Sequence, residues 1–180
     1  MIDDKSVIRY ANANQRLEKV LEKLTKDFCK NNCDIEDPIG CCHGPDFYRT
    51  GFGDNLLLLV NQQEEAIGNG WKEDSKIGCK YYIDGSGCPL VKYKPPFCVG
   101  YICHSIKQSI LGAYERDNKA VNFVEAMDDL FSSLIPFSSK KNIRKTIKKT
   151  LRAARSGEKL IKLTPKGVTP YEFIIQSYEP

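Results

Sequence analysis

Eight cysteines are the residues of this sequence whose type and spacing suggest chemistry. They all lie between positions 29 and 103 of a 180-residue chain, namely Cys29, Cys33, Cys41, Cys42, Cys79, Cys88, Cys98 and Cys103. A buried cysteine packs as a small hydrophobe and has no reason to cluster, so thiols confined to one region indicate disulfides or a metal. We expect a cytoplasmic protein, because no signal-peptide pattern is visible and no apolar run reaches the roughly 18 residues that a membrane span needs. Thiols stay reduced in that compartment, which favours a metal.

The cysteine spacing reads C-x3-C-x7-C-C and, after a gap, C-x8-C-x9-C-x4-C. It matches neither the paired knuckles of common zinc fingers nor the bacterial ferredoxin run. The adjacent Cys41 and Cys42 point in diverging directions, so they fit ligands to different irons of a cluster, or to two neighbouring sites. Eight thiols exceed the four that one site uses. The pattern therefore allows two centres, or one centre with spare cysteines, holding an iron–sulfur cluster or zinc.

Both histidines of the chain directly follow a cysteine, in Cys42-His43 and Cys103-His104. Imidazole is a good ligand for zinc and iron, so either histidine is a candidate ligand. The alternative is that both lie in solvated loops, and the sequence leaves this open.

The segments "CKNNCDIEDPIGCCHG" and "CKYYIDGSGCPLVKYKPPFCVGYIC" together resemble the YkgJ-like cysteine-cluster proteins, which are described as zinc- or iron-chelating domains. The shared features are an early cysteine pair, a Cys-Cys dipeptide, a Gly-Cys and a basic-Pro stretch before a cysteine. The gap of seven residues before Cys41 is longer than is usual in that family. The resemblance covers residues 29–103 and implies that the eight cysteines are metal ligands. Some relatives are flagellin lysine methylases with an iron–sulfur cluster.

We therefore expect a metal-binding protein that holds an iron–sulfur cluster or zinc through these cysteines. The alternative is an iron–sulfur-dependent enzyme with a redox or group-transfer reaction, as the methylase relatives imply. The sequence contains no phosphate-loop, dinucleotide-binding, zinc-protease or serine-hydrolase motif that would name a reaction or a substrate.

The elements that position the cysteines are predicted to be mainly helices. An amphipathic helix is expected over residues 11–30, where apolar residues recur at helical spacing and Cys29 falls in the last turn: Leu17, Val20, Leu21, Leu24 and Phe28. Further helices are expected over 55–67, 117–134 and 139–155. For residues 117–134 we expect one apolar face formed by Val121, Val124, Met127, Leu130 and Phe131.

Residues 78–103 look irregular, with short strand-like pieces such as CKYYI before the turn DGSG, and the tail contains a β-leaning YEFII. The predicted fold is thus mainly α, with helical flanks around an irregular cysteine-rich metal-binding centre with short strands. We expect one domain over residues 1–180. Its parts would be the cysteine-cluster core at 29–103, a helical pair at 117–155 and a tail at 156–180.

The predicted helix over 139–155 belongs to a strongly basic segment. Residues 138–162 contain ten lysines and arginines and one acid, Glu158, so the segment carries +9, while the whole chain carries +4 and the remainder −5. A narrow apolar stripe, expected to be Ile143, Ile147, Leu151 and Ala154, would dock this helix and leave its cationic face outside. That face at 140–155 could attract nucleic acid, an anionic membrane or an acidic partner, could complement the acidic remainder of the chain, or could be solvated. No aromatic residue is interleaved, which disfavours single-strand binding by stacking.

Overall fold

The computed structural model describes residues 4–32, 94–132 and 139–176, and in these ranges it contains helices and no strand. The mainly helical fold class is therefore confirmed. The predicted helix at 55–67, the strand-like CKYYI and most of the cysteine-rich centre lie outside the described residues. The helices are α1 (Asp4–Asn32), α3 (Pro96–Gly100), α4 (His104–Ala113), α5 (Asn118–Phe131), α6 (Lys140–Ile161) and α7 (Pro170–Gln176).

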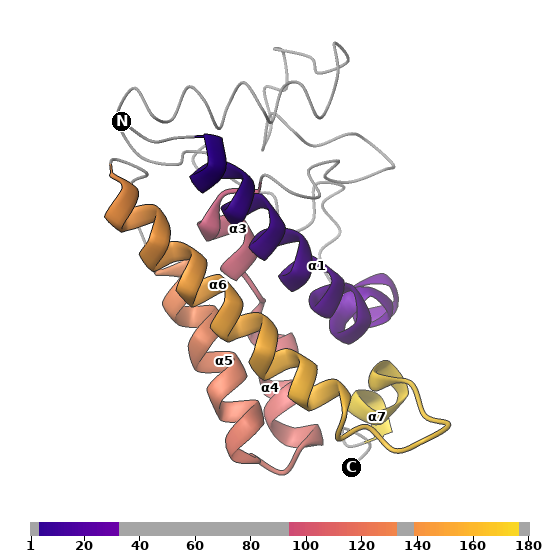
Figure 1. The fold of residues 1–180 in the computed structure, drawn as a ribbon. Coiled ribbons are helices and arrows are strands. Elements are labelled where there is room, and N and C mark those ends of the chain that lie inside the picture. Colours follow the sequence, from indigo (N-terminus) through magenta and orange to yellow (C-terminus); the bar gives the residue numbers. More distant parts are fainter. Residues whose placement is uncertain (1–3, 33–93, 133–138, 177–180) are drawn as a thin grey trace, which may run out of the picture.

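The three longest of these helices pack side by side, with α6 between α1 and α5 (Figure 1). Helix α1 runs parallel to α6, and α5 runs antiparallel to it (Figure 1). The short helix α3 lies against α5 and also contacts α1, while α4 and α7 pack together. The core between these elements contains Leu17, Leu24, Ile110, Phe123, Met127, Leu130, Leu160 and Ile174.

Helix α1 forms where the apolar spacing predicts it, but it begins seven residues earlier, at Asp4. Its buried face continues towards the N-terminus through Val7, Tyr10 and Ala11, which adds two turns. Cys29 falls in the last turn, as predicted, and the helix ends at Asn32.

The predicted apolar face of α5 is partly wrong. Met127 and Leu130 are buried as expected, but Val121, Val124 and Phe131 are half-buried, and the rest of the buried face is formed by Ala120, Phe123 and Ala126. The reason is that α5 packs against α6 on one side and against α3 and α4 on another, so its buried face is rotated.

The predicted stripe on α6 is also partly wrong, because Ile147 and Leu151 are only half-buried. The buried face follows three- and four-residue steps through Ile143, Thr146, Thr150, Ala153, Ala154, Gly157 and Leu160. The two threonines tolerate burial because each hydroxyl donates to a backbone carbonyl one turn earlier, at 3.1 and 3.0 Å. These small residues let neighbouring helices approach closely.

Three further elements differ from the prediction. The expected irregular region includes the helical turn α3, which begins at the proline pair Pro95–Pro96, and the next helix, α4, was not predicted. The expected tail at 156–180 is helical at both ends of its described part, because α6 continues to Ile161 and YEFII lies in α7. A short apolar run does not distinguish a strand from a helix turn, which explains the error at YEFII.

The helix starts have clear local causes. Asp117 and Ser139 accept hydrogen bonds from backbone N–H groups at the beginnings of α5 and α6. Before α7, Thr169 and Glu172 form a reciprocal capping box. No helix in the described ranges has the length and apolar character required to cross a bilayer.

Candidate functional site

Three of the eight predicted metal ligands lie in the described residues. Cys29 is exposed in the last turn of α1, while Cys98 in α3 and Cys103 directly before α4 are half-buried. His104, a candidate ligand, is exposed at the start of α4. The remaining predicted ligands Cys33, Cys41, Cys42, Cys79 and Cys88, together with His43, lie outside the described residues.

The described cysteines do not by themselves form a metal site. Within residues 4–32, 94–132 and 139–176, no three His, Cys, Asp or Glu side chains gather in an arrangement that could hold an ion. The prediction that the early and late cysteines share a centre therefore remains a prediction, since five of the eight sulfurs fall outside these ranges.

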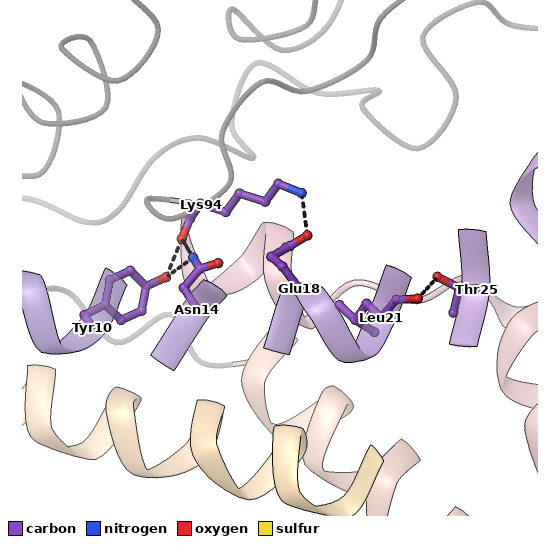
Figure 2. A network of polar contacts seen from close by, with 6 residues as sticks. All are labelled: Tyr10, Asn14, Glu18, Leu21, Thr25 and Lys94. Carbon is purple, nitrogen blue, oxygen red and sulfur yellow. Dashed lines mark hydrogen bonds and ion pairs between the residues drawn. The ribbon is translucent and has the colours of Figure 1, made fainter. Parts of the chain in front are cut away.

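The segment that carries Cys98 is held against α1 by a buried polar network (Figure 2). The Tyr10 hydroxyl donates to the carbonyl oxygen of Lys94, and Asn14 Nδ2 donates to the same oxygen at 2.7 Å and lies 3.4 Å from Tyr10 Oη. Lys94 Nζ lies 2.9 Å from a carboxylate oxygen of Glu18. Three side chains spaced four residues apart on α1 thus contact Lys94, which lies four residues before Cys98 in the chain.

Electrostatics keep Tyr10 in its neutral, donating form. Burial raises the pKa of the Tyr10 hydroxyl well above its ordinary value, the hydrogen bond with Asn14 lowers it, and negative charge on Cys98 and Glu18 raises it. Asn14 is fully buried, and its Oδ1 has no hydrogen-bond partner among the described residues. This network therefore fixes the backbone at Lys94, and Asn14 Oδ1 remains an acceptor without a partner in the described part of the chain.

A second set of contacts fixes the same segment on α5. The ring of Phe97 stacks on Phe131 with centroids 4.2 Å apart, and Tyr101 tilts against the same ring at 5.5 Å. Gly100 lies so close to the end of α5 that a Cβ there would be 2.8 Å from the carbonyl carbon of Leu130. The backbone between Cys98 and Cys103 is therefore positioned from two sides, by α1 and by α5.

Helix α1 separates Cys29 from the Cys98 segment. Tyr10 and Asn14, which hold the carbonyl of Lys94 near Cys98, lie 19 and 15 positions before Cys29 on α1. At 1.5 Å per residue these offsets correspond to about 22 to 28 Å of helix. An arrangement of two centres, which the excess of thiols already allows, accommodates this separation more simply than one centre containing both cysteines.

The residues that anchor Lys94 are not among those predicted from the sequence. Tyr10, Asn14 and Glu18 follow a four-residue spacing, and this polar line on an amphipathic helix was an available signal. Their partner could not be deduced, because Lys94 is 84 residues from Tyr10 and 80 from Asn14 in the chain.

Comparisons of the chain with protein-family models, with curated proteins and with solved structures give no match. A functional conclusion therefore depends on the residues of this chain.

Proposed function

We propose that this protein binds a metal through its clustered cysteines, as an iron–sulfur cluster or as zinc. The observation that carries the proposal is the confinement of all eight cysteines to residues 29–103, with none in the other 105 residues. Thiolates are the preferred protein ligands of both kinds of centre. The resemblance to the YkgJ-like cysteine-cluster proteins supports the same function.

The surroundings of the described cysteines are compatible with ligation. Cys29 is exposed, Cys98 is half-buried, and Cys103 is half-buried at the edge of the core, where part of its side chain remains accessible. Ordering a flexible loop costs conformational entropy, so ligands that are already held in place reduce the free-energy cost of metal binding. The hydrogen bonds to Lys94 and the fixed φ of Pro95 and Pro96 restrict the segment that carries Cys98.

Purification without oxygen, followed by metal and acid-labile sulfide analysis, tests this proposal. A brown protein with iron, sulfide and visible absorption indicates an iron–sulfur centre and supports a redox or group-transfer role. A colourless protein with about one or two zinc ions per chain indicates a binding module with a structural metal. A chain that contains neither, and that gains neither after reconstitution with iron and sulfide or with zinc, would refute the proposal.

Single substitutions then test the described ligands. We expect Cys98→Ser and Cys103→Ser each to lower the metal content, because the hydroxyl of serine is a poor replacement for a thiolate. Ser105→Ala, at an exposed position in α4, is the matched control and should keep the wild-type content. Unchanged metal in both cysteine variants would remove these two residues from the ligand set.

A further inference from the structure

Helix α6 carries its cations along one line directly opposite its buried face. Lys141, Lys148, Arg155 and Lys162 are exposed and follow each other at intervals of seven residues. The buried Ile143, Thr150 and Gly157 repeat at the same interval, displaced by two positions. Two positions correspond to about 200° around an α-helix, so the two lines lie on opposite sides.

We define the cationic stripe as this line together with the exposed basic residues beside it. Its members are Lys141, Arg144, Lys145, Lys148, Arg152, Arg155, Lys159 and Lys162. From Lys141 to Lys162, the residue that caps the end of α6, the stripe extends over 21 steps along the helix, which is about 32 Å at 1.5 Å per residue.

Few acids neutralise the stripe in the described part of the chain. Arg152 lies 3.4 Å from a carboxylate oxygen of Asp129. Glu158 forms a bidentate pair with Arg16 of α1, with both contacts at 2.8 Å. In the described ranges, no carboxylate lies within ion-pairing distance of the four stripe members nearest the start of α6, Lys141, Arg144, Lys145 and Lys148. In these ranges, ion pairing between the stripe and acids from the rest of the chain is therefore limited to Arg152, in the second half of α6.

The stripe continues onto α1 through a groove. This groove, with a volume of about 440 Å³, is lined by Lys162 of the stripe and by Arg16, Lys19 and Lys23 of α1, over a floor that includes Val20 and Ile161. Two acids also line the groove. Glu158 pairs with Arg16, and Glu22 pairs with Lys26 at 3.3 Å. The groove thus adds Lys19 and Lys23 of α1 to the cations at the end of the stripe, with the neutral Arg16–Glu158 ion pair between them.

We propose that this surface binds the phosphate backbone of a nucleic-acid duplex. Long, evenly spaced rows of lysine and arginine suit a regular polyanion, because each phosphate contact releases a condensed counterion. Single-stranded nucleic acid needs aromatic stacking platforms, and the stripe contains none. Lysine and arginine contacts to phosphates carry no base information, so the binding is independent of sequence.

Two other polyanions fit the surface less well. A membrane-bound amphipathic helix inserts its apolar face, whereas the apolar face of α6 is buried in the core. A protein partner is anchored by apolar or aromatic residues at the centre of an interface. The exposed large hydrophobic residues of the described part are Ile8, Tyr101 and Leu163, none of which belongs to the stripe.

The test measures binding of the full-length protein to a labelled 20-base-pair DNA duplex by fluorescence anisotropy. If about five cations contact phosphates, the logarithm of the affinity falls with the logarithm of salt with a slope of about −4.5. Raising salt from 50 to 200 mM then weakens binding about 500-fold. The double variant Lys145→Glu/Lys148→Glu removes two contacts, which lowers the slope to about −2.7 and the affinity at 50 mM salt by about 200-fold.

The control variant is Arg116→Glu/Lys119→Glu, which changes the net charge by the same amount in the turn before α5 and in the first turn of α5. We expect its affinity to stay within about threefold of the wild type, because neither position belongs to the stripe or the groove. Equal losses in both variants would mean that net charge alone matters, and would overturn the proposal. Circular dichroism checks that each variant folds. If Lys145→Glu/Lys148→Glu does not fold, Lys145→Gln/Lys148→Gln is measured in its place.

Two further results would overturn the proposal. One is no binding to the duplex at 50 mM salt with protein up to 100 μM. The other is tighter binding to phosphatidylserine vesicles or to polyglutamate than to the duplex in the same buffer, which would assign the surface to a membrane or to an acidic protein. The outcome does not depend on metal content, so this proposal and the proposed metal binding fail separately.

Discussion

Replacing Gly100 by alanine tests whether α3 is fixed by its close approach to α5. A Cβ at this position would lie 2.8 Å from the carbonyl carbon of Leu130 and 2.9 Å from the Cα of Phe131. Both are backbone atoms, and Leu130 is fully buried, so no flexible side chain can move aside. The substitution must therefore push α3 away from the end of α5.

The cost follows from three contributions. Overpacking against a rigid neighbour destabilises a protein by about 1–3 kcal/mol. Loss of the stacking between Phe97 and Phe131 adds about 0.5–1.5 kcal/mol, while the better helix propensity of alanine returns less than about 1 kcal/mol at a helix end. We expect Gly100→Ala to lower the free energy of unfolding by about 2 kcal/mol.

Urea unfolding followed by far-ultraviolet circular dichroism measures this loss. The matched control is Gly112→Ala, an exposed glycine in α4, which should gain up to about 1 kcal/mol from helix propensity alone. If Gly100→Ala unfolds at the same urea concentration as the wild type or higher, the packing of α3 against α5 is not as tight as described. Because α3 carries Cys98, the metal content of the same variant also reports whether this contact supports the proposed site.

Two further predictions concern other elements. Gly157→Ala should lower the free energy of unfolding by about 1–2 kcal/mol, because its Cβ would meet the ring of Phe123 at 3.0 and 3.3 Å and contact Val20. In a chain that already carries Val20→Ala, the same substitution should cost less. Fully additive losses in this double-mutant cycle would contradict the packing. Hydrogen bonds from the backbone N–H and the hydroxyl of Thr169 hold the pKa of Glu172 below its ordinary value. The stabilisation by this carboxylate is thus present above the unfolded-state pKa and is lost as pH falls through the lowered folded value. An NMR titration midpoint for Glu172 at or above the ordinary value of a glutamate in an unfolded chain would contradict the capping box.

The sequence predicted the long helices well because they depend on local signals. The apolar spacing of residues 17–28 identified α1, and helix starts near Asp117 and Ser139 were placed within a residue or two. Which side of α5 and α6 is buried was predicted less well. That choice depends on neighbouring helices, and on α6 the pattern included Thr146 and Thr150, which satisfy their hydroxyls within the helix and pack as small residues.

The candidate site was predictable in its residue types and not in its geometry. Clustering of cysteines is visible in the sequence, but the side chains that hold their backbone are far away in the chain. The hydrogen bond from Asn14 to the Lys94 carbonyl joins residues 80 positions apart. The close approach of Gly100 to α5 likewise depends on tertiary packing, and a glycine between two cysteines has no feature that distinguishes it from an ordinary turn glycine.

The two proposals use different sides of α1, and this separation is a consequence of its helical spacing. Tyr10, Asn14 and Glu18 form the line that holds the segment leading to Cys98, whereas Lys19 and Lys23 lie in the groove beside α6. Nine residues separate Asn14 from Lys23, which is about 180° around an α-helix at 3.6 residues per turn. The metal-ligand segment and the cationic surface therefore face away from each other across one rigid helix. Binding at one of them does not require a contact with the other, so charge reversal at Lys145 and Lys148 should leave the metal content of the protein unchanged.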